Sequence, residues 1–407
     1  MRRLPIGNWI LSTLVLSAGA IPACGQSSTS APTTQAFAHG LIARPDYFPI
    51  AVWLQDPKNA SRYKAIGINL YVGLWKGPTA EQLLVLEKAE MPVICAPTEY
   101  GLKNQDRRII VGWMHEDEPD NAQSLGPEKG YGPPITPERI PADYRRIHLL
   151  DPSRPVLLNL GQAVAWNDWY GRGVRTRHPE DYAQYAQGAD ILSFDIYPVT
   201  HDRKEVSGNL WLVGQGVERL RDWSQDRQPV WACIETTHIS NPQVRPTPEQ
   251  IRSLVWMALV HGARGLVYFA HEFKPRFIEA GLLTYPEISQ AVGKINRQVA
   301  GLAPVLNSPT LSGLATASSS NPAVPIHVLN KDYGGTVYVF AIAMRDGETT
   351  GRFRAPGLGP QATVKVLDEN RSIAARDGEW EDSFQAYGVH LYQVDQRSGS
   401  PSTRNAP

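Results

Sequence analysis

The sequence predicts an α/β protein in which a closed (β/α)8 TIM barrel is followed by a small antiparallel β-sandwich. Short apolar runs alternate with amphipathic stretches at roughly even intervals, which is the pattern of repeated βα units. Eight such runs with their helices fill about 260 residues, the usual size of a closed barrel. An open doubly wound sheet is the alternative; it would need a glycine-rich phosphate loop after its first strand, and residues 53–61 contain none.

The barrel strands are expected in apolar runs at 48–55, 68–75, 91–97, 109–114, 156–161, 190–199, 229–236 and 265–273. Helices are expected between them, for example at 79–90 and 248–263. Thr247 and Gln250 form a capping signal at the start of the second of these helices, and Gly262 marks its end. After residue 306 apolar and polar residues alternate between closely spaced turn residues, which predicts about six or seven antiparallel strands.

The N-terminal region is typical of an exported protein. Arg2 and Arg3 precede an apolar stretch that is too short to span a membrane, so we interpret it as a signal peptide. The residues before Cys24 resemble a bacterial lipobox, whose cysteine is lipidated, although Pro22 departs from that motif and plain secretion remains the alternative. The expected location is the bacterial cell envelope. The predicted segments are the signal peptide 1–23, a flexible linker 24–40, the barrel 41–306, the β-sandwich 307–395 and a disordered tail 396–407.

Composition limits the possible partners. Forty basic and forty acidic residues cancel, so charge supports neither a nucleic-acid partner nor a membrane surface; membrane contact is expected only through the lipid anchor. Cys95 and Cys233 lie in apolar strands and are expected to be buried free thiols rather than a disulfide. No CxxC or HExxH spacing is present, so no metal or cofactor is predicted, and the oligomeric state is left open.

The chain is organised around residues 109–120, IIVGWMHEDEPD. A continuous apolar run of this kind predicts a strand that is buried on both faces. Its end carries Glu116, Asp117 and Glu118, and the functional groups of barrels gather at the C-terminal ends of strands. An acidic loop that only solvates the strand end is the alternative.

The other predicted strand ends carry mainly carboxylates, amides and aromatic rings. These groups match the hydroxyls and ring faces of sugars, so we expect a carbohydrate substrate. The candidate substrate-binding residues are Trp53, Tyr71, Trp75, Glu116, Asp117, Asn159, Asp195, Tyr197 and His271.

Glu235 ends an otherwise apolar strand, where an ionised carboxylate needs a partner or a function. Glu118 lies three βα units earlier, so the two side chains are expected to face one another across the barrel mouth. Glycosidic cleavage needs such a pair, one to protonate the leaving oxygen and one to attack the sugar or activate water. A Glu235 that turns outward to cap the next helix is the alternative.

The segments Asp117-Glu118-Pro119 and Ile234-Glu235-Thr236 resemble the two signature positions of the retaining (β/α)8 glycoside hydrolases of clan A, the four-seven superfamily. The resemblance covers about residues 45–305 and implies that Glu118 is the general acid/base and Glu235 the nucleophile of a double displacement. It also implies that Tyr197 steadies the nucleophile. Asp117 replaces the Asn of the superfamily motif, and Phe269 and His271 stand where the superfamily often has a Trp, so the substrate subsite is not assigned.

Three alternatives remain open from the sequence. Glu116 competes with Glu118, because both lie on one side of a regular strand. A noncatalytic glycan-binding surface lipoprotein would keep the aromatic residues without a working carboxylate pair. A metal-dependent hydrolase would use His115, Glu116, His201 and His271, which show no ligand spacing.

Overall fold

The computed structural model describes residues 37–40 and 44–395. The predicted fold class is confirmed: eight parallel strands close into a barrel in chain order, and β1 pairs with both β2 and β8. The barrel strands are β1 (Ile50–Trp53), β2 (Leu70–Val72), β3 (Val93–Cys95), β4 (Ile110–Met114), β5 (Val156–Leu160), β6 (Ile191–Phe194), β7 (Val230–Glu235) and β8 (Gly265–Phe269). Each predicted run contains its strand, and most runs extend past it into the loops.

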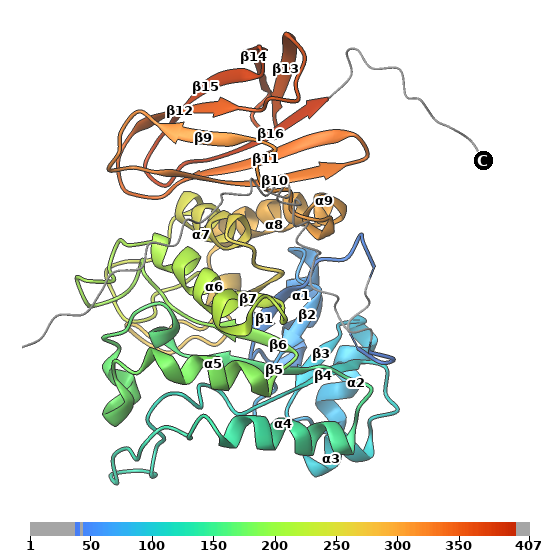
Figure 1. The fold of residues 1–407 in the computed structure, drawn as a ribbon. Helices are drawn as coiled ribbons and strands as arrows, with labels where there is room; N and C mark the ends of the chain where they lie inside the picture. The colour runs from blue at the N-terminus through green and yellow to red at the C-terminus, as the bar shows by residue number, and fades with distance from the viewer. Residues whose placement is uncertain (1–36, 41–43, 396–407) are drawn as a thin grey trace, which may run out of the picture.

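Helices surround the barrel (Figure 1). They are α1 (Ala60–Ala65), α2 (Ala80–Ala89), α3 (Glu99–Lys103), α4 (Arg139–Leu150), α5 (Tyr182–Tyr185), α6 (Trp211–Ser224), α7 (Pro248–Val260), α8 (Pro286–Gly301) and α9 (Ala303–Asn307). Helix α7 begins with the predicted capping box, in which Thr247 and Gln250 each bond the other's backbone N–H. The connection between β5 and β6 consists of short 3₁₀ turns and α5 rather than one long helix.

Side chains alternate between two sides of the barrel wall. In β1, Ala51 and Trp53 belong to the apolar cluster inside the barrel, whereas Ile50 and Val52 pack outward against the helices. This alternation explains why the strands are apolar at every position. It also decides which residues at the strand ends can reach the barrel axis.

The start of β4 is fixed by a buried ion pair. Arg154 Nη1 donates to Asp151 Oδ2 at 2.7 Å, and Arg154 Nε donates to the carbonyl oxygen of Ile110 at 2.7 Å. The indole Nε1 of Trp113 also donates to Asp151, at 2.9 Å. These bonds anchor β4 and therefore hold the strand that leads to Glu118.

The C-terminal strands form one antiparallel sheet of eight, in the order β10-β11-β16-β13-β14-β15-β12-β9. They are β9 (Thr316–Ser319), β10 (Ile326–Tyr333), β11 (Thr336–Ala343), β12 (Thr349–Arg354), β13 (Gln361–Val366), β14 (Arg371–Arg376), β15 (Glu379–Phe384) and β16 (Val389–Asp395). The prediction of six or seven strands was therefore too low.

This β domain lies against α7, α8 and α9 (Figure 1). Trp256 of α7 is fully buried, and its ring centroid lies 5.1 Å from that of Phe340 in β11. Ser253 Oγ donates to the carbonyl oxygen of Tyr387 at 2.8 Å. Helix α7 is apolar nearly all round because it is covered by the barrel on one side and by the β domain on the other.

The predicted signal peptide, Cys24 and the C-terminal tail lie outside the described residues, as does most of the predicted linker. Within the described ranges, none of the helices combines the length and apolarity that a membrane span requires. Cys95 and Cys233 are buried free thiols, as predicted.

Candidate active site

Glu118 adopts an unusual backbone conformation just beyond the end of β4. Its φ is +44°, a left-handed value that side chains other than glycine rarely adopt and that stores about 1–3 kcal/mol of strain. The turn is closed by the N–H of Asn121, which donates to the carbonyl oxygen of Glu118 at 3.0 Å. Gly161, after β5, makes room for the side chain, because a Cβ there would lie 3.0 Å from Glu118 Oε1. The chain therefore directs Glu118 toward the tip of β5.

Glu118 is the centre of a group of carboxyls. Burial raises the pKa of Glu118 well above its usual range, and the charges of Asp195, Asp117 and Asp120 raise it further. A side-chain hydrogen bond with Asp195 acts in the same direction. Burial also raises the pKa of Asp195, and its Oδ1 atom is buried without a hydrogen-bond partner in the described structure. Neighbouring carboxyls disfavour each other's charged form, so these interactions favour the protonated form of Glu118.

The neighbouring acids are held by polar contacts from adjacent strands. Asn159 Nδ2 donates to Asp117 Oδ1 at 2.9 Å, and Asn159 Oδ1 accepts a 2.8 Å hydrogen bond from Ser193 Oγ. Asp120 is fully buried and accepts from the N–H of Gly161 at 2.9 Å. Asn159 thus orients Asp117, which suits the predicted role of both residues near a substrate.

Glu235 is held by hydrogen bonds from the loop after β6. It is 1% exposed; Oε1 accepts from the N–H of Val199 at 2.6 Å, and Oε2 accepts from both the N–H and the hydroxyl of Thr200, at 3.0 and 2.8 Å. Burial raises the pKa of Glu235 to about 7, although these hydrogen bonds act in the opposite direction. Glu235 is therefore tied to the loop after β6, whereas the side-chain hydrogen bond of Glu118 is with Asp195.

Tyr197 lies beside Asp195 rather than serving Glu235. Its phenol hydrogen-bonds with the Asp195 carboxyl, and its ring centroid lies 5.0 Å from that of Phe269 on β8. The sequence resemblance implied that Tyr197 would steady the nucleophile at position 235. The loop after β6 provides backbone donors for that carboxylate instead.

A row of aromatic rings leads from this group toward solvent. Phe269 lies 5.2 Å from His271, and the His271 ring is stacked with Phe273 at 6.2 Å and with Phe277 at 5.8 Å. Phe273 is 44% exposed and Phe277 61% exposed. Sequence analysis did not identify Phe273 or Phe277, although two phenylalanines in the polar loop after the last strand were the available signal.

The remaining candidates lie in different surroundings. Trp53 points into the barrel and is buried, Trp75 is exposed after β2, and Glu116 is exposed outside the group of carboxyls. Tyr71 is a correction: it is fully buried on the outward face of β2, and its hydroxyl donates to the carbonyl oxygen of Asp56 at 3.4 Å. Strand alternation turns Tyr71 away from the barrel axis and from any substrate there.

The histidines of the metal-hydrolase alternative have separate partners. His115 Nε2 bonds the carbonyl oxygen of Gly188 at 2.7 Å, His201 Nε2 bonds Gln162 Oε1 at 2.8 Å, and His271 Nε2 lies 3.2 Å from Gln55 Nε2. Among the described residues, the group with metal-ligand spacing is a different one, Glu218, His261 and His327.

Comparisons with known proteins support the fold. No family model matches the chain, and no curated protein matches it in sequence. An α-amylase from Geobacillus thermoleovorans, solved with acarbose, is 11% identical with a TM-score of 0.52. The match covers 87% of this chain and 99% of the amylase chain. An Anoxybacillus α-amylase, described as providing insights into a new glycosyl hydrolase subclass, is 11% identical with a TM-score of 0.50. The match covers 88% of this chain and 100% of that amylase chain. The chain therefore shares its barrel fold, over most of its length, with solved α-amylases.

Proposed function

We propose that this protein is a glycoside hydrolase that cleaves O-glycosidic bonds of an oligo- or polysaccharide, with Glu118 as the general acid. The observation that carries the proposal is the raised pKa of Glu118 beside Asp195, at the end of the barrel where such folds bind substrates. A carboxylic acid that keeps its proton at neutral pH is what protonation of a glycosidic oxygen requires. The shared fold with an α-amylase solved in complex with acarbose agrees with this proposal.

In the proposed retaining reaction, Glu118 donates its proton to the leaving oxygen while a carboxylate attacks the anomeric carbon and forms an ester. The ionised Glu118 then takes a proton from water, whose oxygen bonds to the anomeric carbon as the ester bond breaks. Two displacements return the sugar with its original configuration and restore the protonated acid.

Glu235 is the proposed nucleophile because it ends β7. Its burial sets a condition on that role: one of its oxygens must become accessible to the anomeric carbon before it can attack. Asp195 is the second candidate, since it adjoins Glu118 and one of its oxygens has no partner in the described structure.

The aromatic row provides a surface for the sugar. Phe273 and Phe277 are exposed next to His271, and the apolar faces of pyranose rings pack on aromatic surfaces of this kind. The substrate is therefore proposed to extend from Glu118 past Phe269 toward Phe277.

The test is hydrolysis of a panel of polysaccharides and aryl glycosides by the protein and by Glu118→Gln, Glu235→Gln and Asp195→Asn. Glu116→Gln is the matched control, because Glu116 is an exposed acid two residues before Glu118. We expect Glu118→Gln to lose nearly all activity and Glu116→Gln to keep it. Equal activity in both variants would refute the role of Glu118, and binding without hydrolysis across the panel would favour the noncatalytic glycan-binding alternative.

The nucleophile is tested by trapping with a 2-deoxy-2-fluoro glycoside of the sugar that the panel identifies. Mass spectrometry of the digested protein then locates the ester. We expect it on the peptide that contains Glu235; an ester on Asp195 would transfer the role to that residue, and the absence of any ester would refute double displacement.

We also propose that the protein is exported to the cell envelope, on the N-terminal pattern of Arg2, Arg3 and Cys24. Radiolabelled palmitate fed to expressing cells would label the protein but not a Cys24→Ser variant. Release of unlabelled protein into the medium would support plain secretion.

A further inference from the structure

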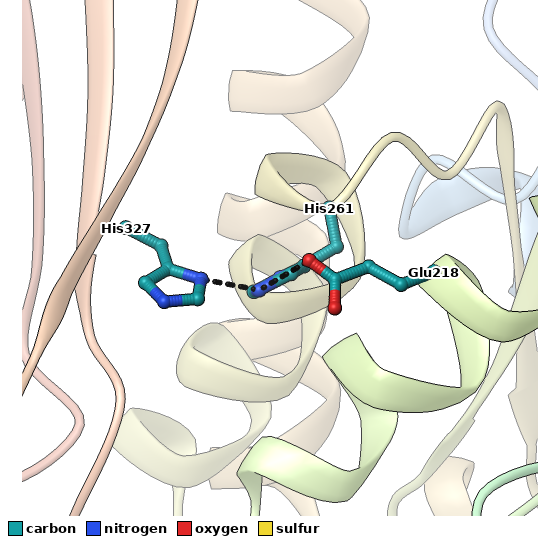
Figure 2. Close-up of side chains that lie close together, drawn as sticks. All are labelled: Glu218, His261 and His327. Atoms are coloured by element: carbon teal, nitrogen blue, oxygen red, sulfur yellow. Dashed lines mark hydrogen bonds and ion pairs between the residues drawn. The ribbon is translucent and has the colours of Figure 1, made fainter. Parts of the chain in front are cut away.

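Three side chains with metal-binding groups meet where the barrel contacts the β domain (Figure 2). Glu218 comes from α6, His261 directly follows α7, and His327 comes from β10. One ligand atom from each lies within 4.8 Å of the other two. These residues are distant in the sequence and lie outside the candidate active site.

His261 is held in the orientation of a metal ligand. Its ring is buried, and Nδ1 lies 2.6 Å from the carbonyl oxygen of Met257. A carbonyl oxygen can only accept, so the proton is on Nδ1 and the lone pair is on Nε2. Histidines bound to metals through one nitrogen usually donate from the other nitrogen to a group of this kind.

Gly214 of α6 makes room for this imidazole. A Cβ at position 214 would lie 2.7 Å from both Cε1 and Nδ1 of His261, so a larger residue would displace the ring. The His261 ring is therefore fixed by packing as well as by its hydrogen bond, with Nε2 directed at the other two residues (Figure 2).

The distances fit a small cation after a minor adjustment. His261 Nε2 lies 2.9 Å from His327 Nδ1 and 3.7 Å from Glu218 Oε1. Two nitrogens bound to one tetrahedral Zn²⁺ at about 2.0–2.1 Å lie roughly 3.3 Å apart. His327 is exposed, so a shift of a few tenths of an ångström is open to it.

We propose that Glu218, His261 and His327 bind a divalent transition metal ion of the Zn²⁺ type and thereby tie the β domain to the barrel. Two imidazoles and one carboxylate favour Zn²⁺ over Mg²⁺ or Ca²⁺, which prefer oxygen ligands. Water completes the coordination on the exposed side.

Binding of the metal at this site releases no proton. In the structure His327 Nδ1–H donates to the lone pair of His261 Nε2, since the His261 proton is on the other nitrogen. When the metal binds between them, the His327 proton moves to its Nε2, which leaves Nδ1 free to coordinate. The metal then takes the place of the hydrogen bond between the two rings.

Two arginines lie near the three ligands and oppose a cation. Arg221 Nη1 donates to the carbonyl oxygen of His261 at 2.9 Å, and its charge is offset by Asp226, at 2.7 Å from Arg221 Nε. Arg345 stacks over the Trp211 ring at 4.4 Å. Because one arginine is paired and the other is drawn to an aromatic face, the carboxylate of Glu218 remains available to the metal.

The test is calorimetric titration of the chelator-treated full chain with Zn²⁺, together with the absorption spectrum of the Co²⁺ form. We expect one Zn²⁺ per chain and the visible bands of four-coordinate Co²⁺. His327→Ala and Glu218→Gln change exposed residues, and each is expected to weaken Zn²⁺ binding at least about tenfold and to remove the Zn²⁺-dependent rise in Tm.

His178→Ala is the matched control, because His178 is a partly exposed histidine whose Nδ1 lies 2.6 Å from Glu180 but which has no buried histidine beside it. It should bind Zn²⁺ as the parent does. Failure of the parent to bind Zn²⁺, or binding that His327→Ala leaves unchanged, would overturn the proposal.

Discussion

The carboxyl groups of Glu118 and Asp195 interact directly although they follow different strands, β4 and β6. Burial is the main cause of the raised pKa of Glu118, and the interaction with Asp195 raises this pKa further. Both effects favour the protonated form of Glu118. Barrel closure brings the ends of these strands together and favours the protonated form of two carboxyls that would both be ionised in water.

The raised pKa of Glu118 predicts a stability that falls with pH. The folded protein holds a proton that the unfolded chain releases near its ordinary pKa of 4.5, so the stability from this group is complete below that pH and is lost as the pH rises toward the folded pKa. Glu118→Gln does not titrate and should be more stable than the parent at pH 8, with a gap that grows by at most about 1.4 kcal/mol per pH unit. Urea unfolding at several pH values measures this gap, and a gap independent of pH would contradict the prediction.

Asp195→Asn is expected to move the alkaline limb of the pH–activity profile to lower pH, by about one unit. The substitution removes the charge that raises the pKa of Glu118, so the general acid loses its proton earlier as the pH rises. The profile of kcat/KM against pH gives the shift, with Glu116→Gln as a control that should leave the limb in place. An unchanged limb in Asp195→Asn would show that the two carboxyls are not coupled.

Phe277→Ala should raise KM about two- to tenfold with little effect on kcat, because loss of one aromatic contact removes roughly 0.5–1.5 kcal/mol of substrate binding. Phe277 is exposed, so the fold should not change. Tyr333→Ala, which removes an exposed aromatic ring from the β domain, is the control. Equal KM values in all three proteins would exclude the aromatic row from the substrate path.

Asp151→Ala should lower the free energy of unfolding by about 3–5 kcal/mol, since it leaves the buried Arg154 guanidinium without its counter-ion. Asp143→Ala breaks a surface ion pair with Arg139 and should lower it by less than about 1 kcal/mol. Urea unfolding of the parent and the two variants measures the loss in the free energy of unfolding that each substitution causes. Similar losses in both would mean that the buried pair does not anchor β4.

The barrel was predictable because each strand is buried on both faces, which leaves a continuous apolar run in the sequence. Residues Thr247 and Gln250 located a helix start, since a capping box is a local interaction. The strand ends were less predictable: the run at 190–199 continues past β6 into a buried loop that also is apolar.

Glu118 could be named as a candidate because it follows an apolar strand and precedes a proline. Asp195 was also a candidate, but its pairing with Glu118 was not predictable, because it depends on the registers of β4, β5 and β6 and on the left-handed turn at Glu118. The hydrogen bonds of Glu235 likewise depend on the path of the loop at Val199 and Thr200, which no local pattern encodes.

The cluster of Glu218, His261 and His327 could not be predicted from the sequence, because the three residues do not form a spacing motif. Its members come from two helical segments of the barrel and one strand of the β domain, and the packing of the two domains brings them together. Spacing rules detect metal sites only where the ligands share a local element.

The central claim is that Glu118 donates the proton to the leaving oxygen. The most direct measurement is kcat/KM of the parent and of Glu118→Gln on aryl glycosides whose leaving groups range from strongly to weakly acidic phenols. Glu118→Gln should retain most activity on the most acidic phenols, which leave without protonation, and lose about 10²- to 10⁴-fold on the least acidic. The same fractional loss across the whole series, or no loss at all, would contradict the claim.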